Sequence, residues 1–182
     1  TLGVMIQEPS IPVASQANVF PFCSAPRGDA LLGIIVAPTM VRFGSGEPEV
    51  ELMAWLITGG AGMLATDVVE ELQARGQEYV AVDVDELDIT DPKAVQKFVS
   101  DLKPEVIINC AAYTAVDAAE EDEATAFAVN AVGPQHLAHA AKNAGATYVQ
   151  ISTDYVFGGD ASTPYRATDP LRPVGAYGRT KA

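Results

Sequence analysis

The sequence has few cysteines, few basic residues and no long unbroken apolar run, and each shortage excludes a class of protein. Cys23 and Cys110 are the only cysteines. Two thiols so far apart form no metal or redox motif, so we expect a reducing compartment, the cytoplasm. Eleven Lys and Arg against 24 Asp and Glu give a net charge of -13, which argues against a nucleic-acid partner. The longest apolar run, residues 30–41, is interrupted by Pro38 and is too short to span a membrane.

Metal centres and serine hydrolase sites also lack the residues that they need. His136 and His139 lie three residues apart, but no third metal ligand is near them, so we expect no bound metal. Ser152 and Asp154 would suit a hydrolase, yet the chain has no Gly-x-Ser-x-Gly motif around a nucleophile. Metal chemistry and serine hydrolysis therefore receive little support.

Two features are expected to be structural. The longest block of like charge is 120–123, with the sequence Glu-Glu-Asp-Glu. We interpret it as a solvated first helical turn, where acidic side chains favour the helix dipole. Cys110 follows an apolar stretch and is expected to pack as a small buried side chain.

Residues 1–52 differ in composition from the rest of the chain. They hold six of the twelve prolines, Pro9, Pro12, Pro21, Pro26, Pro38 and Pro48, and this spacing prevents a continuous helix. We expect 1–52 to be an irregular extension outside the fold, or alternatively the tail of an upstream domain in a fusion. The chain begins with Thr1, so we expect a fragment or an unusual reading frame. Met53 is the natural start of a second unit, 53–182.

From residue 53 onward, apolar strands alternate with amphipathic helices. Helices are expected at about 64–74, at 92–102 after the capping Asp91, and over about 118–143, with Pro134 as a kink or boundary. The strands expected between them are apolar on both faces and span 54–58, 79–83, 106–110 and 147–152. This pattern predicts an α/β fold of the Rossmann type, a doubly wound parallel sheet with helices on both faces.

A glycine-rich loop follows the first of these strands. Gly59 permits a tight turn, and Gly62 lets the backbone approach a pyrophosphate at the start of the next helix. Asp83 follows 21 residues after Gly62, where a carboxylate accepts hydrogen bonds from the adenosine ribose and repels a 2′-phosphate. We therefore predict a dinucleotide site that favours NADH or tolerates both NADH and NADPH. Asp88 lies where an adenine would rest, but a simple turn aspartate is an equal alternative.

A hydroxyl, a phenol and an ammonium near the end of the chain suit carbonyl reduction. Tyr177 and Lys181 lie one helical turn apart, so we expect the lysine charge to lower the pKa of the tyrosine. Tyr177 would donate its proton as the hydride arrives, and Thr153 would hold the carbonyl oxygen. Lys181 would also reach the ribose of the nicotinamide. Tyr-x-x-x-Lys is common by chance, but behind a dinucleotide loop it becomes a strong signal.

Several stretches together resemble the dTDP-4-dehydrorhamnose reductase family, a branch of the extended short-chain dehydrogenases. The most specific are Ala-Ala-Tyr-Thr-Ala-Val-Asp at 111–117 and Ser-Thr-Asp-Tyr-Val-Phe at 152–157. Leu-Ile-Thr-Gly-Gly-Ala-Gly at 56–62, Glu-Leu-Asp-Ile-Thr-Asp at 86–91 and the closing 177–181 also match. The resemblance runs from Met53 to the end and covers none of 1–52.

The resemblance implies NADPH- or NADH-dependent reduction of the C4 ketone of a dTDP-linked 4-keto-6-deoxy sugar, which yields dTDP-L-rhamnose. It implies the catalytic residues Thr153, Tyr177 and Lys181, and sugar contacts from Thr153 and Asp154. The cofactor-binding positions would be Gly59, Gly62, Met63, Leu64, Asp83, Asp88, Ile89, Ala112, Tyr113, Thr114, Tyr177 and Lys181. From composition we expect no nucleic-acid or membrane partner, and a homodimer is a further expectation. Metal or dimer contacts that the family makes beyond the lysine are not carried over to this chain.

Two alternatives stay open at this point. One is a related reductase or epimerase that acts on another nucleotide sugar, and the other is a non-catalytic regulatory subunit that binds dinucleotide. Members of the family continue past the lysine into a region that holds the sugar nucleotide, and we expect that region to be missing from this chain. We therefore expect dinucleotide binding at best, no useful turnover, and fraying of the helix that carries Tyr177 and Lys181.

Overall fold

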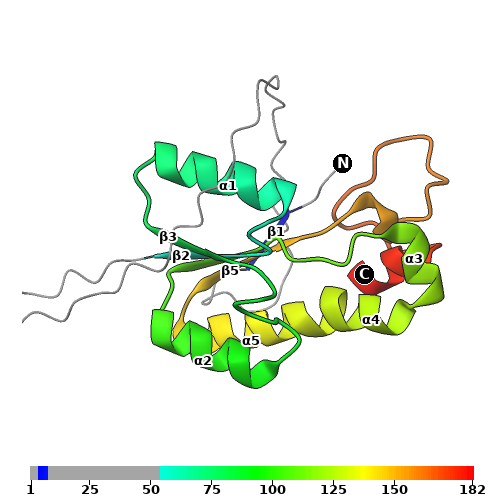
Figure 1. The fold of residues 1–182 in the computed structure, drawn as a ribbon. Coiled ribbons are helices and arrows are strands. Elements are labelled where there is room, and N and C mark those ends of the chain that lie inside the picture. The colour runs from blue at the N-terminus through cyan, green and yellow to red at the C-terminus, as the bar shows by residue number, and fades with distance from the viewer. Residues whose placement is uncertain (1–3, 8–53) are drawn as a thin grey trace, which may run out of the picture.

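The computed structural model describes residues 4–7 and 54–182, and these residues form one five-stranded sheet with helices on both faces (Figure 1). The strands are β1 (Val4–Gln7), β2 (Trp55–Thr58), β3 (Tyr79–Val82), β4 (Val106–Asn109) and β5 (Thr147–Ile151). Their order across the sheet is β1-β5-β4-β2-β3. Strands β2 to β5 are parallel to one another, which confirms the predicted Rossmann-type sheet.

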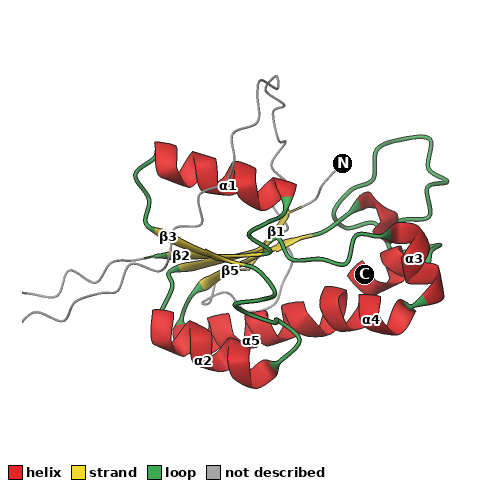
Figure 2. Cartoon of the chain, in the orientation of Figure 1, coloured by secondary structure: helices red, strands yellow, loops and turns green. Residues whose placement is uncertain are grey.

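Helix α1 (Met63–Ala74) covers one face of the sheet, and helices α2 (Pro92–Leu102) and α5 (Gly133–Ala144) cover the other (Figure 1). Figure 2 shows these helices and the loops that join them to the strands. Helix α2 begins as predicted, because the Asp91 carboxylate accepts hydrogen bonds from the N–H groups of Lys93 and Ala94 at 2.8 and 3.3 Å. Such a cap satisfies donors that have no partner within the helix.

The core lies on both sides of the sheet, as strands with two apolar faces require. Leu56 and Ile107 pack with Val95, Val99 and Leu137 on the α2–α5 face, and all five are fully buried. On the other face the buried side chains are Ile57, Ala65 and Leu72. Two buried layers fix the sheet between its helices, so the carboxyl ends of four parallel strands meet at one edge.

The helical stretch predicted over about 118–143 is found, but it is divided into more segments than the prediction gave. The structure has α3 (Val116–Glu121), α4 (Glu123–Phe127), a π-helical segment (Ala128–Val132) and α5 in sequence. The break falls at Asp122, whose side chain caps α4 by accepting a hydrogen bond from the N–H of Thr125 at 3.0 Å. Pro134 lies at a boundary, one of the two predicted alternatives, because it occupies the first turn of α5 directly after the π-helical segment, where an N–H is not needed.

Strand β1 was not predicted. It pairs antiparallel with β5 at the edge of the sheet, with Met5 opposite Gln150, so residues 4–7 join the sheet although they lie within the predicted extension. We did not predict this strand because it is short, lies among many prolines, and has no adjacent segments with the same strand pattern. The rest of the extension, Cys23 included, lies outside the described residues, and a division of the chain at Met53 stays a prediction.

A further helix, α6 (Ala176–Lys181), follows a long loop and a 3₁₀ turn, η2 (Asp154–Val156). It carries Tyr177 and Lys181 to the side of the sheet where α3 lies (Figure 1). Within the described residues, no helix is both long and apolar enough to cross a membrane.

Candidate active site

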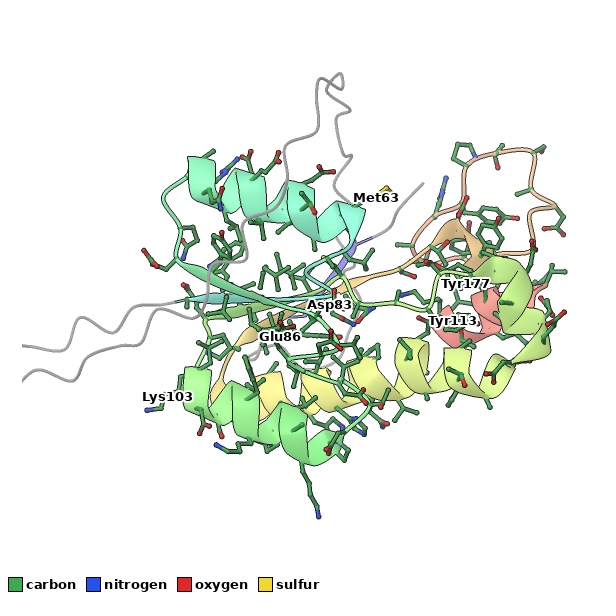
Figure 3. All side chains as sticks on the ribbon, viewed as in Figure 1. Met63, Asp83, Glu86, Lys103, Tyr113 and Tyr177 are labelled. Atoms are coloured by element: carbon green, nitrogen blue, oxygen red, sulfur yellow. The ribbon has the colours of Figure 1, made fainter. Side chains whose placement is uncertain are left out.

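A cavity of about 620 Å³ opens at the carboxyl ends of the parallel strands, the usual position of ligands in open α/β sheets. Loops after β2, β3, β4 and β5 line it together with α6. Figure 3 shows Met63 and Asp83 on the α1 side, and Tyr113 and Tyr177 together near α3. Of the predicted site residues, Asp154 is the only one that does not line the cavity; those that do are Gly59, Gly62, Met63, Leu64, Asp83, Asp88, Ile89, Ala112, Tyr113, Thr114, Thr153, Tyr177 and Lys181.

The glycine-rich loop is shaped by a close approach of two backbones. Gly59 has φ +72°, and a Cβ there would lie 2.6 Å from the backbone of Ala111. Glycine alone permits both the left-handed conformation and the contact. Gly62 precedes α1 and provides no side-chain cap for it. The first N–H groups of α1 therefore face the cavity without a side chain in front of them, which suits an anionic ligand.

Asp83 is held by this loop. Its carboxylate accepts a hydrogen bond from the N–H of Ala61 at 2.8 Å and another from the N–H of Val84 at 2.7 Å. The side chain of Glu86 accepts a hydrogen bond from the Asp83 N–H at 3.0 Å. Fixed main-chain donors aim the carboxylate, as a residue that contacts a ribose requires.

Asp88 forms a turn and also lines the cavity. Its carboxylate accepts hydrogen bonds from the N–H and the hydroxyl of Thr90 at 2.8 and 2.7 Å. Ile89 is buried, and its carbonyl oxygen lies 3.1 Å from Nδ1 of His136. His136 is therefore engaged with the backbone. Across the described ranges, the His, Cys, Asp and Glu side chains form no group able to hold a metal.

The stretch 112–114 forms the floor of the cavity and is fixed by Asn130, a residue that the sequence analysis did not identify. The Asn130 side-chain oxygen accepts a hydrogen bond from the N–H of Tyr113 at 2.9 Å. Its amide nitrogen donates to the carbonyl of Tyr113 and to the hydroxyl of Thr180, both at 3.0 Å. Asn130 is almost fully buried and lies in the π-helical segment. The sequence alone carried no signal of this role, because the π-helical segment, a feature frequent at functional sites, is visible only in the structure.

The predicted catalytic hydroxyls lie together. Thr153 and Tyr177 line the same cavity, and the Thr153 hydroxyl is near enough to lower the pKa of Tyr177. The ring of Tyr155 meets that of Tyr177 edge to face, with centroids 5.6 Å apart. Asp154 is exposed and accepts a hydrogen bond from the Thr153 hydroxyl at 3.2 Å. The sugar contact expected of Asp154 stays a prediction, because this side chain is outside the cavity lining.

The predicted fall in the pKa of Tyr177 is not found. Burial raises this pKa above its ordinary value and outweighs the effect of the nearby Thr153 hydroxyl, which lowers it. The negative charge of Asp154 raises it further. Tyr177 is thus a protonated phenol at neutral pH, which is the form that donates a proton.

Lys181 lies on the same face of α6 and reaches the last strand. Its Nζ donates a hydrogen bond to the carbonyl oxygen of Ile151 at 2.8 Å. Burial lowers the pKa of Lys181 to about 8, because a low-dielectric environment disfavours the ammonium. The side chain is still charged at neutral pH, and its charge lies at the cavity wall.

The structure has the helix with Tyr177 and Lys181 formed to its last turn, and its fraying stays a prediction. Helix α6 persists through Lys181, and Ala182 donates its N–H to the carbonyl of Gly178 at 3.0 Å. Contacts from other elements hold the helix, which a prediction from chain position alone did not include. Gly178 packs so closely on the carbonyl of Tyr155 that a Cβ would lie 2.2 Å from it.

The acidic run 120–123 was predicted to be a solvated first turn, and this holds only in part. Asp122 caps α4, but Glu120 accepts a hydrogen bond from the N–H of Ala176 at 2.7 Å, and Glu123 binds Arg179. The partners lie 56 residues further along the chain, so local sequence carries no signal of them.

Several cavity-lining residues were not identified from the sequence. Most are small or apolar and lie beside a predicted residue, so the only indication of their position was that neighbour. They are Ala65, Val84, Leu87, Thr90, Cys110, Ala111, Val129, Ile151 and Ser152. Cys110 is half-buried rather than fully buried, and burial raises the pKa of its thiol to about 11. It is therefore a poor nucleophile at neutral pH.

The fold and the cavity define a Rossmann-type domain of the short-chain dehydrogenase kind, with a glycine loop, an acidic residue after the second parallel strand and a Tyr-x-x-x-Lys helix. The particular family follows from comparison. Residues 53–182 match the RmlD substrate binding domain family, and the chain belongs to that family.

Individual relatives agree with this assignment. A dTDP-4-dehydrorhamnose reductase from Streptomyces griseus is 48% identical over 127 residues, which cover 70% of this chain and 42% of that protein. The crystal structure of a dTDP-4-dehydrorhamnose reductase from Clostridium acetobutylicum has a TM-score of 0.69 and 49% identity, covering 71% of this chain and 46% of that one. A reductase from Bacillus anthracis in complex with NADP has a TM-score of 0.67 and 37% identity, with 71% and 46% covered. This chain thus spans less than half the length of these relatives.

Proposed function

We propose that the protein carrying this chain reduces the C4 ketone of dTDP-4-dehydrorhamnose to give dTDP-L-rhamnose, with NADPH or NADH as the reductant. One observation carries the proposal: Thr153, Tyr177 and Lys181 line a single cavity with the glycine loop and Asp83. The 48% identity to the Streptomyces griseus enzyme supports the substrate class. Three catalytic groups in one cavity favour an enzyme over a regulatory binding subunit.

The residues present suit a dinucleotide. Gly59 leaves no room for a Cβ beside Ala111, the N-terminus of α1 has no side-chain cap, and Asp83 is aimed by two main-chain N–H groups. Together they provide a phosphate cradle next to a ribose acceptor. Gly59, Gly62, Met63 and Leu64 would hold the pyrophosphate side, with the remaining contacts from Asp88, Ile89, Ala112, Tyr113 and Thr114. A bound reduced dinucleotide supplies the hydride.

The protein groups then handle the proton. When the ketone is bound, the Thr153 hydroxyl turns from Asp154, donates its hydrogen bond to the ketone oxygen and orients that oxygen towards Tyr177. The Tyr177 phenol gives its proton to that oxygen as negative charge develops. Lys181, charged at neutral pH, stabilises the resulting phenolate and holds the nicotinamide ribose. The raised pKa of Tyr177 keeps the phenol protonated until the hydride arrives.

Turnover of dTDP-4-dehydrorhamnose tests the proposal. The complete protein is incubated with the keto sugar and either NADPH or NADH, and oxidation of the cofactor is followed by absorbance. Replacement of Tyr177 by Phe should lower kcat by about 10²- to 10⁴-fold and change cofactor affinity far less. Tyr79→Phe, far from the cavity on β3, serves as the control. Equal turnover by wild type and Tyr177→Phe would refute the mechanism.

Three further predictions belong to this proposal. Asp83 supports binding of NADH or of both cofactors, and the Bacillus anthracis relative in complex with NADP supports the second option. A homodimer is the second prediction, and sedimentation measurements of the complete protein test it. A cytoplasmic location rests on the scarcity of cysteine in the sequence.

A further inference from the structure

Helix α6 carries both the phenol and the ammonium, and no side chain of its own caps its first turn. Gly175 precedes it and provides no side-chain cap. The first N–H groups of α6 therefore need partners from elsewhere in the fold.

Glu120, on α3, supplies such a partner. Its Oε1 accepts a hydrogen bond from the N–H of Ala176 at 2.7 Å. The same oxygen lies 2.8 Å from the position that a Cβ on Gly175 would occupy. The carboxylate thus fills the space left by the glycine, and only a residue without a side chain at 175 permits this approach. A charged acceptor on a backbone N–H at a helix start makes a strong hydrogen bond.

A second contact anchors the same helix one turn later. The guanidinium of Arg179 donates from Nε and Nη2 to the two carboxylate oxygens of Glu123 at 2.9 and 2.8 Å. Its Nη1 donates to the carbonyl of Val174 at 3.0 Å. This two-point pairing has a fixed geometry, and it holds the pKa of Glu123 below its ordinary value.

Tyr177 lies between these two anchors. Ala176 is fully buried against Ala119 of α3 and Ala126 of α4, and Tyr177 packs on the same cluster. A shift of the Ala176 main chain would therefore move the phenol relative to Thr153. Glu120 does not line the cavity, so any influence on the reaction passes through the helix.

We propose that Glu120 is a positioning residue: it caps α6 from another helix and so sets the place of the Tyr177 phenol against Thr153. The proposal rests on the proposed reductase function for its kinetic consequence. The hydrogen bond from Ala176 to Glu120 and the close approach of Glu120 to Gly175 do not depend on which substrate is reduced. Glu120 and Glu123 both make hydrogen bonds to α6. Glu121, between them, is exposed as Glu120 is but, within the part of the chain that the structure describes, makes no hydrogen bond to α6, so it serves as a matched control.

The test compares Glu120→Ala, Glu120→Gln and Glu121→Ala in the complete protein. Misplacement of the phenol should lower kcat of Glu120→Ala by about tenfold to a hundredfold, while KM and cofactor affinity change little. Glu120→Gln keeps an oxygen acceptor and should recover most of kcat, and Glu121→Ala should match wild type. Equal kcat for Glu120→Ala and Glu121→Ala would overturn the proposal, as would a failure of Gln to restore activity.

Two readouts need no turnover and separate this proposal from the reductase function. Hydrogen exchange of 176–182 should be faster in Glu120→Ala than in Glu121→Ala. The titration of Tyr177 is obtained by subtracting the titration curve of the same variant that also carries Tyr177→Phe. The pKa found in this way should be lower in Glu120→Ala, because the phenol becomes exposed. If wild type reduces no keto sugar but both changes occur, the reductase function fails and the positioning role stands. If neither changes, the positioning role fails.

Discussion

The side-chain amide of Asn130 pairs with both main-chain polar groups of Tyr113 and with the hydroxyl of Thr180, which in turn donates to the carbonyl of Tyr177 at 2.8 Å. The direction of each hydrogen bond is fixed, since Thr180 has one hydrogen and uses it on Tyr177. One buried amide thereby links the cavity floor to the helix with the phenol. The residue at position 130 must therefore donate hydrogen bonds to both the Tyr113 carbonyl and the Thr180 hydroxyl.

Replacement of Asn130 by Asp should destabilise the fold, because a carboxylate presents acceptors where two donors are needed. The expected loss is about 3 kcal/mol in the free energy of unfolding, since buried groups remain unpaired. Urea denaturation measures it. Asn143→Asp, an exposed site on α5, should change stability much less; equal losses in both variants would show that the Asn130 network contributes nothing special.

Replacement of Gly59 by Ala should be far more damaging than the same change at Gly76. Both glycines have positive φ, +72° and +66°, but a Cβ at Gly76 meets nothing within 4 Å, whereas one at Gly59 meets the Ala111 backbone at 2.6 Å. We expect a loss of about 1 kcal/mol for Gly76→Ala and about 3 kcal/mol for Gly59→Ala. Thermal or urea unfolding tests this difference, and similar losses would mean that the loop moves aside freely.

Lys181 should make stability depend on pH. Its pKa is lowered from 10.5 to about 8 in the folded chain, so between these values the unfolded chain binds more protons. The contribution of this side chain to stability therefore rises with pH across that window. The half-buried Cys110 and Tyr177 have raised pKa values and act in the opposite direction. The measured quantity is therefore the difference between wild type and Lys181→Met.

That difference in the free energy of unfolding should increase in favour of wild type as pH rises from about 8 to 10.5. The exposed Lys142→Met serves as the control and should show no comparable trend. A flat difference for Lys181→Met would mean that Lys181 is not buried as the structure has it. In the active protein, kcat/KM should fall above pH 8, because the ammonium loses its proton.

Replacement of Asp83 by Asn should shift cofactor preference towards NADPH. The change removes a negative charge beside the adenosine ribose but keeps an oxygen that accepts a hydrogen bond. Any effect on the shape of the loop should alter the affinities for NADPH and NADH equally, so it cancels in their ratio. We expect the NADPH-to-NADH affinity ratio to rise about fivefold to tenfold, as loss of a repulsion near 4 Å suggests. Fluorescence titration measures it, with the exposed Asp85→Asn as control. An unchanged ratio would contradict the role of Asp83.

The positions of most site residues could be predicted because the signals are local. The glycine loop, Asp83 and Tyr177–Lys181 follow strands or begin helices, and parallel strands bring their carboxyl ends to one edge. The contacts of Asn130 and Glu120 could not be predicted, since their partners lie 50 and 56 residues away. A charged run or an isolated asparagine looks the same in sequence whether it is solvated or docked.

The sequence by itself determined the alternation of strands and helices, the doubly wound sheet and the set of groups available for reduction, because periodicity and turn residues act over a few positions. Only the tertiary structure decided how α6 is held, why the phenol of Tyr177 has a raised pKa, and that residues 4–7 join the sheet edge. These outcomes depend on burial and on hydrogen bonds between distant segments. Such contacts form only when the whole sheet and its helices pack together.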